Sequence, residues 1–125
     1  MPFPYLVPVL VFGAGGAVSR YLLDAYIGSR FPAAFPRGTF LINVTGSLTL
    51  GLLTGLVVFG HGPAWPSAIL GTGFCGAYTT FSTFTFESLR LMEHGQYRQA
   101  ALNIGGSLTL GLAAAAAGLA VGAWF

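Results

Sequence analysis

The chain has 125 residues, of which 54% are hydrophobic and 6% are charged. A water-soluble domain usually carries about a quarter charged residues, so a soluble fold of this composition would expose large apolar patches. The net charge of +2 rests on too few groups to indicate nucleic-acid binding, and Cys75, the only cysteine, excludes a disulfide framework and a cysteine-rich metal site.

Four apolar segments reach the length of about 20 residues that a helix needs to cross the hydrocarbon core. They are residues 3–27, 38–59, 65–90 and 100–125. Strands of a membrane barrel would instead alternate over about 10 residues, and that pattern does not occur. The sequence therefore predicts an all-α membrane protein with four transmembrane helices.

The first segment lacks the positive leader and small-residue cleavage site of a secretory signal, so we expect a retained transmembrane helix. Arg20 and Asp24 lie in its last turns. Two interpretations of Arg20 stay open. Its permanent charge would raise the local concentration of an anion, or it pairs with Asp24 four residues along the same helix.

The second segment contains no charge, and a turn over residues 60–63 ends it. Thr39, Asn43 and Ser47 follow one another at intervals of four, which places them in one stripe on a helix face. Polar side chains inside a membrane span are costly and mark a pathway or an interhelical contact.

The third segment carries the densest polar cluster, which runs from residue 79 to Glu87. Five hydroxyl residues alternate there with three phenylalanines. A helix would place Thr80, Thr83 and Glu87 on one face and Phe81 and Phe84 on an adjacent face. The glycines in residues 73–77 predict a helix break, because glycine is unfavourable inside a helix and freed carbonyls are tolerated where they line a cavity or bind an ion.

The fourth segment repeats part of the second. Residues 43–52 and 103–112 are identical at all but two positions, and the same offset of 60 aligns Gly13 and Gly16 with Gly73 and Gly76. Asn103 and Ser107 thus correspond to Asn43 and Ser47. We expect a single membrane domain made of two parallel copies of a helix pair, residues 1–60 and 61–125.

Three stretches of the chain form specific motifs: GAGGAVSRY at 13–21, GTFLINVTGS at 38–47 and GFCGAYTTFSTF at 73–84. Through them the chain resembles the Fluc (CrcB) fluoride channels over nearly its whole length. Their order within a four-span chain of this size makes the resemblance specific.

The resemblance implies an antiparallel, dual-topology dimer with two fluoride pores and a structural Na+ at the centre of the interface. The main-chain carbonyls of Gly76 and Thr79 correspond to those that hold the Na+. The pore phenylalanines of the family correspond to Phe81 and Phe84, and its pore asparagine corresponds to Asn43. Its polar track corresponds to Thr80, Thr83, Glu87 and Ser107. Thr39 and Asn103 are further candidates for the pathway, because they lie in the polar stripes of the second and fourth segments. Many relatives of the family carry a tyrosine where this chain has Asn103.

These residue types suit the chemistry of fluoride, which must exchange its water for other donors. Amide N–H groups and hydroxyls can donate to it, and the positive edge of an aromatic ring can stabilise an anion. We therefore expect a non-enzymatic channel that exports F− passively across the cytoplasmic membrane. A small drug transporter would need an acid in mid-membrane, whereas Asp24 and Glu87 lie near span ends. A purely structural subunit would not need the hydroxyl–phenylalanine cluster.

The arginines leave the topology open. Arg30, Arg37, Arg90 and Arg98 all flank the connections between the first two and the last two segments. The positive-inside rule would place these connections in the cytoplasm, whereas an antiparallel homodimer requires insertion in both orientations. We expect a homodimer, and the alternative is a heterodimer with a homologous chain of opposite orientation.

Overall fold

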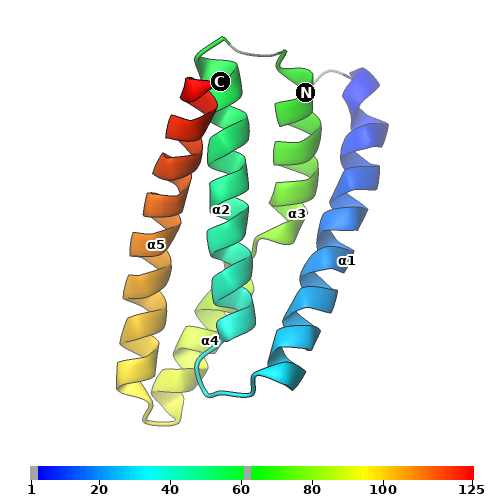
Figure 1. Ribbon diagram of the computed structural model, residues 1–125. Helices are drawn as coiled ribbons and strands as arrows, with labels where there is room; N and C mark the ends of the chain where they lie inside the picture. Colours follow the sequence, from blue (N-terminus) through cyan, green and yellow to red (C-terminus); the bar gives the residue numbers. More distant parts are fainter. Residues whose placement is uncertain (1–2, 61–62) are drawn as a thin grey trace.

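The computed structural model describes residues 3–60 and 63–125, which form a bundle of helices (Figure 1). Residues 61 and 62 of the predicted turn lie outside the described residues. In chain order the elements are η1 (Phe3–Tyr5), α1 (Leu6–Arg30), α2 (Arg37–Val58), η2 (Ser67–Cys75), α3 (Gly76–Tyr78), α4 (Ser82–Glu93) and α5 (Tyr97–Trp124).

The predicted all-helical membrane architecture is confirmed. Within residues 3–60 and 63–125, three helices are long and apolar enough to cross a membrane, namely α1, α2 and α5. The third predicted span is present in pieces, as the π-helix η2, the short α3 and the separate α4. An interruption therefore divides this span, and neither part alone reaches the length of a membrane crossing.

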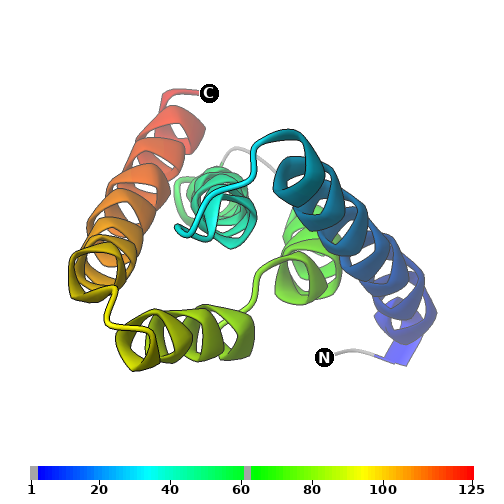
Figure 2. The same ribbon diagram turned by 90° about the horizontal axis from the view of Figure 1, so that it is seen from below.

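The interruption moves the third span from one neighbour to another. Before it, η2 and α3 pack against α1; after it, α4 packs against α5. Figure 2 shows this change, since α4 swings away from α3 and crosses below α2 toward α5. α2 makes its most extensive contact with α5, and it also contacts η2, α3 and α4, so it packs against both parts of the broken span.

Glycines bring the packed helices into close contact. A Cβ atom at Gly16 in α1 would collide with the carbonyl oxygen of Phe74 in η2, and one at Gly73 would lie 2.8 Å from the carbonyl oxygen of Val9. Between α2 and α5, a Cβ at Gly55 would lie 2.5 Å from the carbonyl oxygen of Leu119. Such close approach of backbones is how helices associate in lipid, where no hydrophobic force drives them together.

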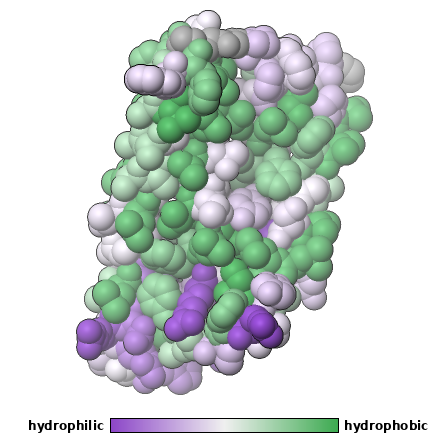
Figure 3. Space-filling model, viewed as in Figure 1, coloured by the Kyte–Doolittle hydropathy of each residue, from purple (hydrophilic) through white to green (hydrophobic). Residues whose placement is uncertain are grey.

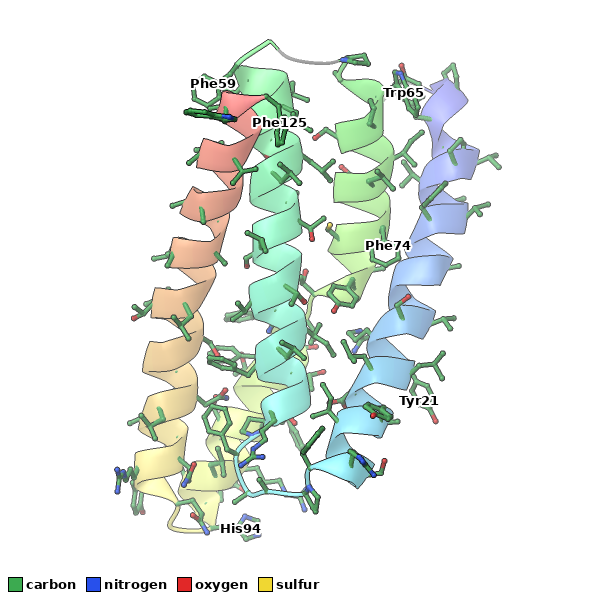
Figure 4. All side chains as sticks on the ribbon, in the orientation of Figure 1. Tyr21, Phe59, Trp65, Phe74, His94 and Phe125 are labelled. Atoms are coloured by element: carbon green, nitrogen blue, oxygen red, sulfur yellow. The ribbon has the colours of Figure 1, made fainter. Side chains whose placement is uncertain are left out.

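The two ends of the bundle differ in polarity. The hydrophilic surface in Figure 3 gathers at the end with the α1–α2 and α4–α5 connections, and the middle is mainly apolar. At the opposite end, where α1 begins and α5 ends, Figure 4 shows Phe59, Trp65 and Phe125. Tryptophan is enriched at the membrane–water interface. The hydrophilic end and the aromatic end therefore have the compositions expected where the bundle meets the two membrane surfaces.

Candidate functional site

The interruption lies at Thr79 and Thr80, slightly later than predicted. The predicted break in the middle of the third span is confirmed, but residues 73–77 are helical, so the break follows these residues and does not lie within them. Thr79 has φ −79° and ψ 156°, an extended conformation that ends α3. The glycines at 73 and 76 do not interrupt the helix, and Gly73 instead permits contact with α1. Glycine in a membrane helix here serves packing.

Asn43 of α2 holds the interrupted main chain with both ends of its carboxamide. Its Nδ2 donates to the carbonyl oxygen of Thr80 at 2.8 Å, and its Oδ1 accepts from the Thr80 N–H at 2.9 Å. In an unbroken helix the Thr80 N–H would bond to the carbonyl of Gly76. The side chain of Asn43 therefore replaces a helical hydrogen bond and stabilises the break.

The break leaves three main-chain carbonyls without hydrogen bonds among the described residues, those of Gly76, Tyr78 and Thr79. Other carbonyls around them are occupied. Cys75 accepts from both the N–H and the hydroxyl of Thr79, and Ala77 accepts from a side chain of α1. Free carbonyl oxygens are ligands for a hard cation, and two of these three are the ones that the resemblance to the channel family indicated.

Arg20 reaches the break from α1. The hydrogen bond that its Nε makes goes to the carbonyl oxygen of Ala77, at 3.3 Å, and not to Asp24. Its guanidinium group thus lies close to the C-terminus of α3, where partial negative charge collects on unpaired carbonyls. This position is compatible with the attraction of an anion toward the break, and it adds a structural contact that the sequence did not indicate.

A cavity of about 330 Å³ lies beside the break, on the side of the bundle where α2, α4 and α5 meet. Five predicted pathway residues line it, namely Asn43, Thr80, Phe81, Phe84 and Ser107, together with Thr79. The rings of Phe81 and Phe84 have centroids 5.9 Å apart and are tilted by 46°. Phe81 is 78% exposed, so its ring faces outward, toward lipid or another chain.

A second cavity of about 690 Å³ lies at the arginine-rich end of the bundle, between α1, the α1–α2 connection and α4. Thr83 and Glu87 line it, together with Asp24, Arg37 and Arg90. One carboxylate oxygen of Glu87, Oε1, is buried and has no hydrogen-bond partner among the described residues. The main-chain N–H of Thr83 donates to the hydroxyl of Thr80, at 3.2 Å, so a hydrogen bond joins residues that line the two cavities.

Two predicted pathway residues line neither cavity. Thr39 is 2% exposed and Asn103 is completely buried. Asn103 donates from Nδ2 to the hydroxyl of Ser88 at 2.8 Å, and that hydroxyl donates to the carbonyl oxygen of Phe84 at 2.8 Å. Ser107 makes a longer contact, 3.4 Å, with Oδ1 of Asn103. Asn103 therefore joins α5 to the turn of α4 that carries Phe84.

Sequence reasoning missed two side chains that support the site. Ser88 lies one turn beyond Phe84, and its spacing of four from this predicted pathway residue was the available signal. Tyr78, whose hydroxyl lies 3.0 Å from that of Thr45, fixes the end of α3 to α2. No local pattern indicates this second contact, because the two residues are 33 positions apart.

Comparison with known proteins gives a consistent result. The family model described as "CrcB-like protein, Camphor Resistance (CrcB)" matches residues 7–119. "Fluoride-specific ion channel FluC 1" of Leifsonia xyli subsp. xyli is 51% identical over 119 residues, which are 94% of this chain and 85% of that protein. "Fluoride-specific ion channel FluC" of Acidobacterium capsulatum is 49% identical over 117 residues, 91% of this chain and 92% of that protein.

Proposed function

The chain belongs to the CrcB-like family, and from this premise we propose that it is a fluoride-specific ion channel that exports F− passively across the cell membrane. The observation that carries the proposal is the coincidence of 51% identity to a fluoride channel with a cavity lined by Asn43, Phe81 and Phe84. A multi-pass membrane channel of this family performs no catalytic step, so the protein is not an enzyme.

The cavity supplies the interactions that fluoride requires when it loses water. The hydroxyls of Thr80 and Ser107 can donate to an anion, as can the N–H of Asn43 that Thr80 leaves free. Phe81 and Phe84 offer ring edges with partial positive charge. The pathway continues along Thr83 toward Glu87 and the arginine-rich cavity.

The direction of transport follows from acid–base chemistry. Hydrogen fluoride crosses membranes as a neutral weak acid and ionises in a less acidic cytoplasm. A membrane potential of 100 mV, negative inside, then contributes about 2.3 kcal/mol per charge to the expulsion of the anion. A selective pore therefore suffices to reduce fluoride toxicity, and no coupled ion has to move.

We also propose that two chains form an antiparallel dimer around a structural Na+. The carbonyl oxygens of Gly76 and Thr79 suit this ion because they accept no hydrogen bond among the described residues. Main-chain oxygen is a ligand that hard cations prefer. The outward exposure of Phe81 supports a second chain on this face, since the pathway would otherwise open to lipid.

The internal repeat of residues 1–60 and 61–125 remains a proposal that the packing supports. Both extensive helix contacts, α1 with η2 and α2 with α5, join a helix of the first half to its counterpart in the second. A Cβ atom placed on Gly13 would lie 3.6 Å from the carbonyl oxygen of its repeat counterpart, Gly73. A crystal structure in which α1–α2 does not superpose on the second helix pair would refute the repeat.

Fluoride efflux from liposomes tests the function. The purified protein should release fluoride rapidly and chloride slowly, and Phe81→Ile should abolish the fluoride flux because it removes an aromatic edge from the cavity. Phe12→Ile is the matched control, since Phe12 is exposed on α1 and lines neither cavity. Absence of fluoride efflux from well-folded dimer would contradict the homodimeric channel and favour the heterodimer.

A further inference from the structure

The two asparagines that are 60 residues apart in the repeat both contact the segment that carries Phe81 and Phe84. Asn43 contacts its start, through the two hydrogen bonds to the main chain of Thr80. Asn103 contacts it further on, through Ser88 and the carbonyl oxygen of Phe84. We refer to residues 80–88 as the phenylalanine segment.

The hydrogen-bonding capacity of these asparagines is largely used in these contacts. A carboxamide has two N–H donors and one acceptor oxygen. Asn43 gives the oxygen and one N–H to Thr80, which leaves one N–H for any ion in the cavity. Asn103 is completely buried and lines neither cavity, so it is not placed to touch an ion.

The phenylalanine segment has few other contacts to orient it. Its helix, α4, packs mainly against α5, and the side-chain hydrogen bond at its start comes from within the segment, where the hydroxyl of Thr80 accepts from the N–H of Thr83. Phe81 is 78% exposed within one chain, so burial does not fix its ring. The part-buried bonds of Asn43 to Thr80 and the buried bond of Asn103 to Ser88 are therefore specific contacts that can orient the segment.

We propose that Asn43 and Asn103 are positioning residues that hold the phenylalanine segment at two points, from α2 and from α5, so that Phe81 and Phe84 keep their orientation in the ion pathway. For Asn103 the connection runs through Ser88 to the Phe84 carbonyl. This inference rests on the proposed fluoride channel, and it assigns to Ser88, which lines neither cavity, an effect on ion selectivity.

Ser88→Ala is the central variant, and Thr85→Ala is its matched control. Both hydroxyls lie on α4 and donate to the carbonyl four residues earlier, Thr85 to Phe81 at 2.9 Å and Ser88 to Phe84 at 2.8 Å. Only the hydroxyl of Ser88 also receives the bond from Asn103. Asn103→Leu removes this bond while keeping a branched side chain of similar size.

In liposomes, Ser88→Ala and Asn103→Leu should each lower the ratio of fluoride to chloride flux about tenfold, and the double variant should lower it no further. Thr85→Ala should stay within about twofold of the wild type. Contacting residues give non-additive effects of this kind. An additive double variant, or a Ser88→Ala ratio equal to that of Thr85→Ala, would overturn the proposal.

Hydrogen exchange of the full-length dimer tests the same contacts without ion flux. Asn43→Ala should speed amide exchange at residues 79–81, and Ser88→Ala should speed it at residues 84–88, because each loses a contact that restrains local opening. Unchanged exchange in both variants would refute the proposal that Asn43 and Asn103 hold the phenylalanine segment at two points. A wild type that releases no fluoride would contradict the homodimeric channel, and the exchange result would still decide the positioning roles.

Discussion

Gly118 of α5 lies directly against the main chain of α2 at Leu48, with no space for a side chain between them. A Cβ at this position would collide with the carbonyl oxygen of Leu48 and lie 2.7 Å from the amide nitrogen of Leu52. Because both obstacles are backbone atoms, neither can rotate away. The distance between α2 and α5 is therefore set by the absence of a side chain.

Gly118→Ala should accordingly destabilise the protein by about 1–3 kcal/mol, as overpacking does elsewhere. Gly105→Ala on the same helix is the control, since a Cβ there meets nothing within 4 Å. Alanine is favoured over glycine in a helix by about 1 kcal/mol, so this control should be neutral or more stable. Thermal unfolding in detergent measures both, and equal melting temperatures would contradict the packing described.

Arg20 can act through its charge or through its hydrogen bond to Ala77. If charge attracts the anion, Arg20→Gln should slow fluoride efflux severalfold at about 10 mM salt and much less at 1 M, where the screening length falls from about 30 Å to about 3 Å. Arg20→Lys should stay within about twofold of the wild type. Equal losses in both variants at every salt concentration would indicate that the hydrogen bond matters instead.

Glu87 places a carboxylate oxygen without a partner among the described residues beside the arginine-rich cavity. A negative charge on an anion pathway opposes the approach of the anion, so Glu87→Gln should conduct fluoride at least as fast as the wild type. Asp24→Asn, in the same cavity, is the comparison. Loss of fluoride efflux in Glu87→Gln alone would show that the carboxylate itself is required.

Sodium should stabilise the dimer through the carbonyls of Gly76 and Thr79. A ligand that binds only the folded state stabilises it by about 1.4 kcal/mol for each tenfold rise above its dissociation constant. Replacement of Na+ by N-methylglucamine should therefore lower the melting temperature and favour dissociation, which light scattering would detect. A melting temperature that does not respond to Na+ would exclude this site.

Both orientations in the membrane are expected for a homodimer. Reporters fused to the C-terminus should give signal on both membrane sides, even though four arginines lie at one end of the bundle. Signal on one side only would follow from the positive-inside rule and would make an oppositely oriented partner chain necessary. Co-expression with a homologous chain would then restore fluoride efflux.

The four spans could be predicted from the sequence because each apolar segment is long enough to cross a membrane. The predicted ends of the segments differ from the ends of the helices. The apolar run of the first span ends near Ile27, whereas α1 continues to Arg30. A basic residue is favourable at a helix C-terminus, and its long side chain can reach the polar zone. Apolar length alone therefore underestimates a helix that ends in arginine.

The helix break could be anticipated but not located. Gly73 and Gly76 led to a predicted position that is a few residues too early. In the sequence, a glycine that permits close packing cannot be distinguished from one that interrupts a helix. The break is instead stabilised by Asn43, 37 residues away, whose Oδ1 accepts from the Thr80 N–H. Thr80, Thr83 and Glu87 were expected on one helix face, but the break separates them, so that Thr80 lines one cavity and Thr83 and Glu87 line the other. The burial of Asn103 depends on how α4 meets α5.

The pairing of each early helix with a late one has a consequence for biosynthesis. α1 packs mainly on η2, and α2 packs mainly on α5. Because the chain is synthesised from its N-terminus, α1 and α2 enter the bilayer before the helices that they pack against have been made. At about 5–20 residues per second, the ribosome needs on the order of several seconds to deliver the second half. During this interval the glycine faces of α1 and α2 have no packing partner, and membrane proteases and insertion factors encounter an incomplete protein.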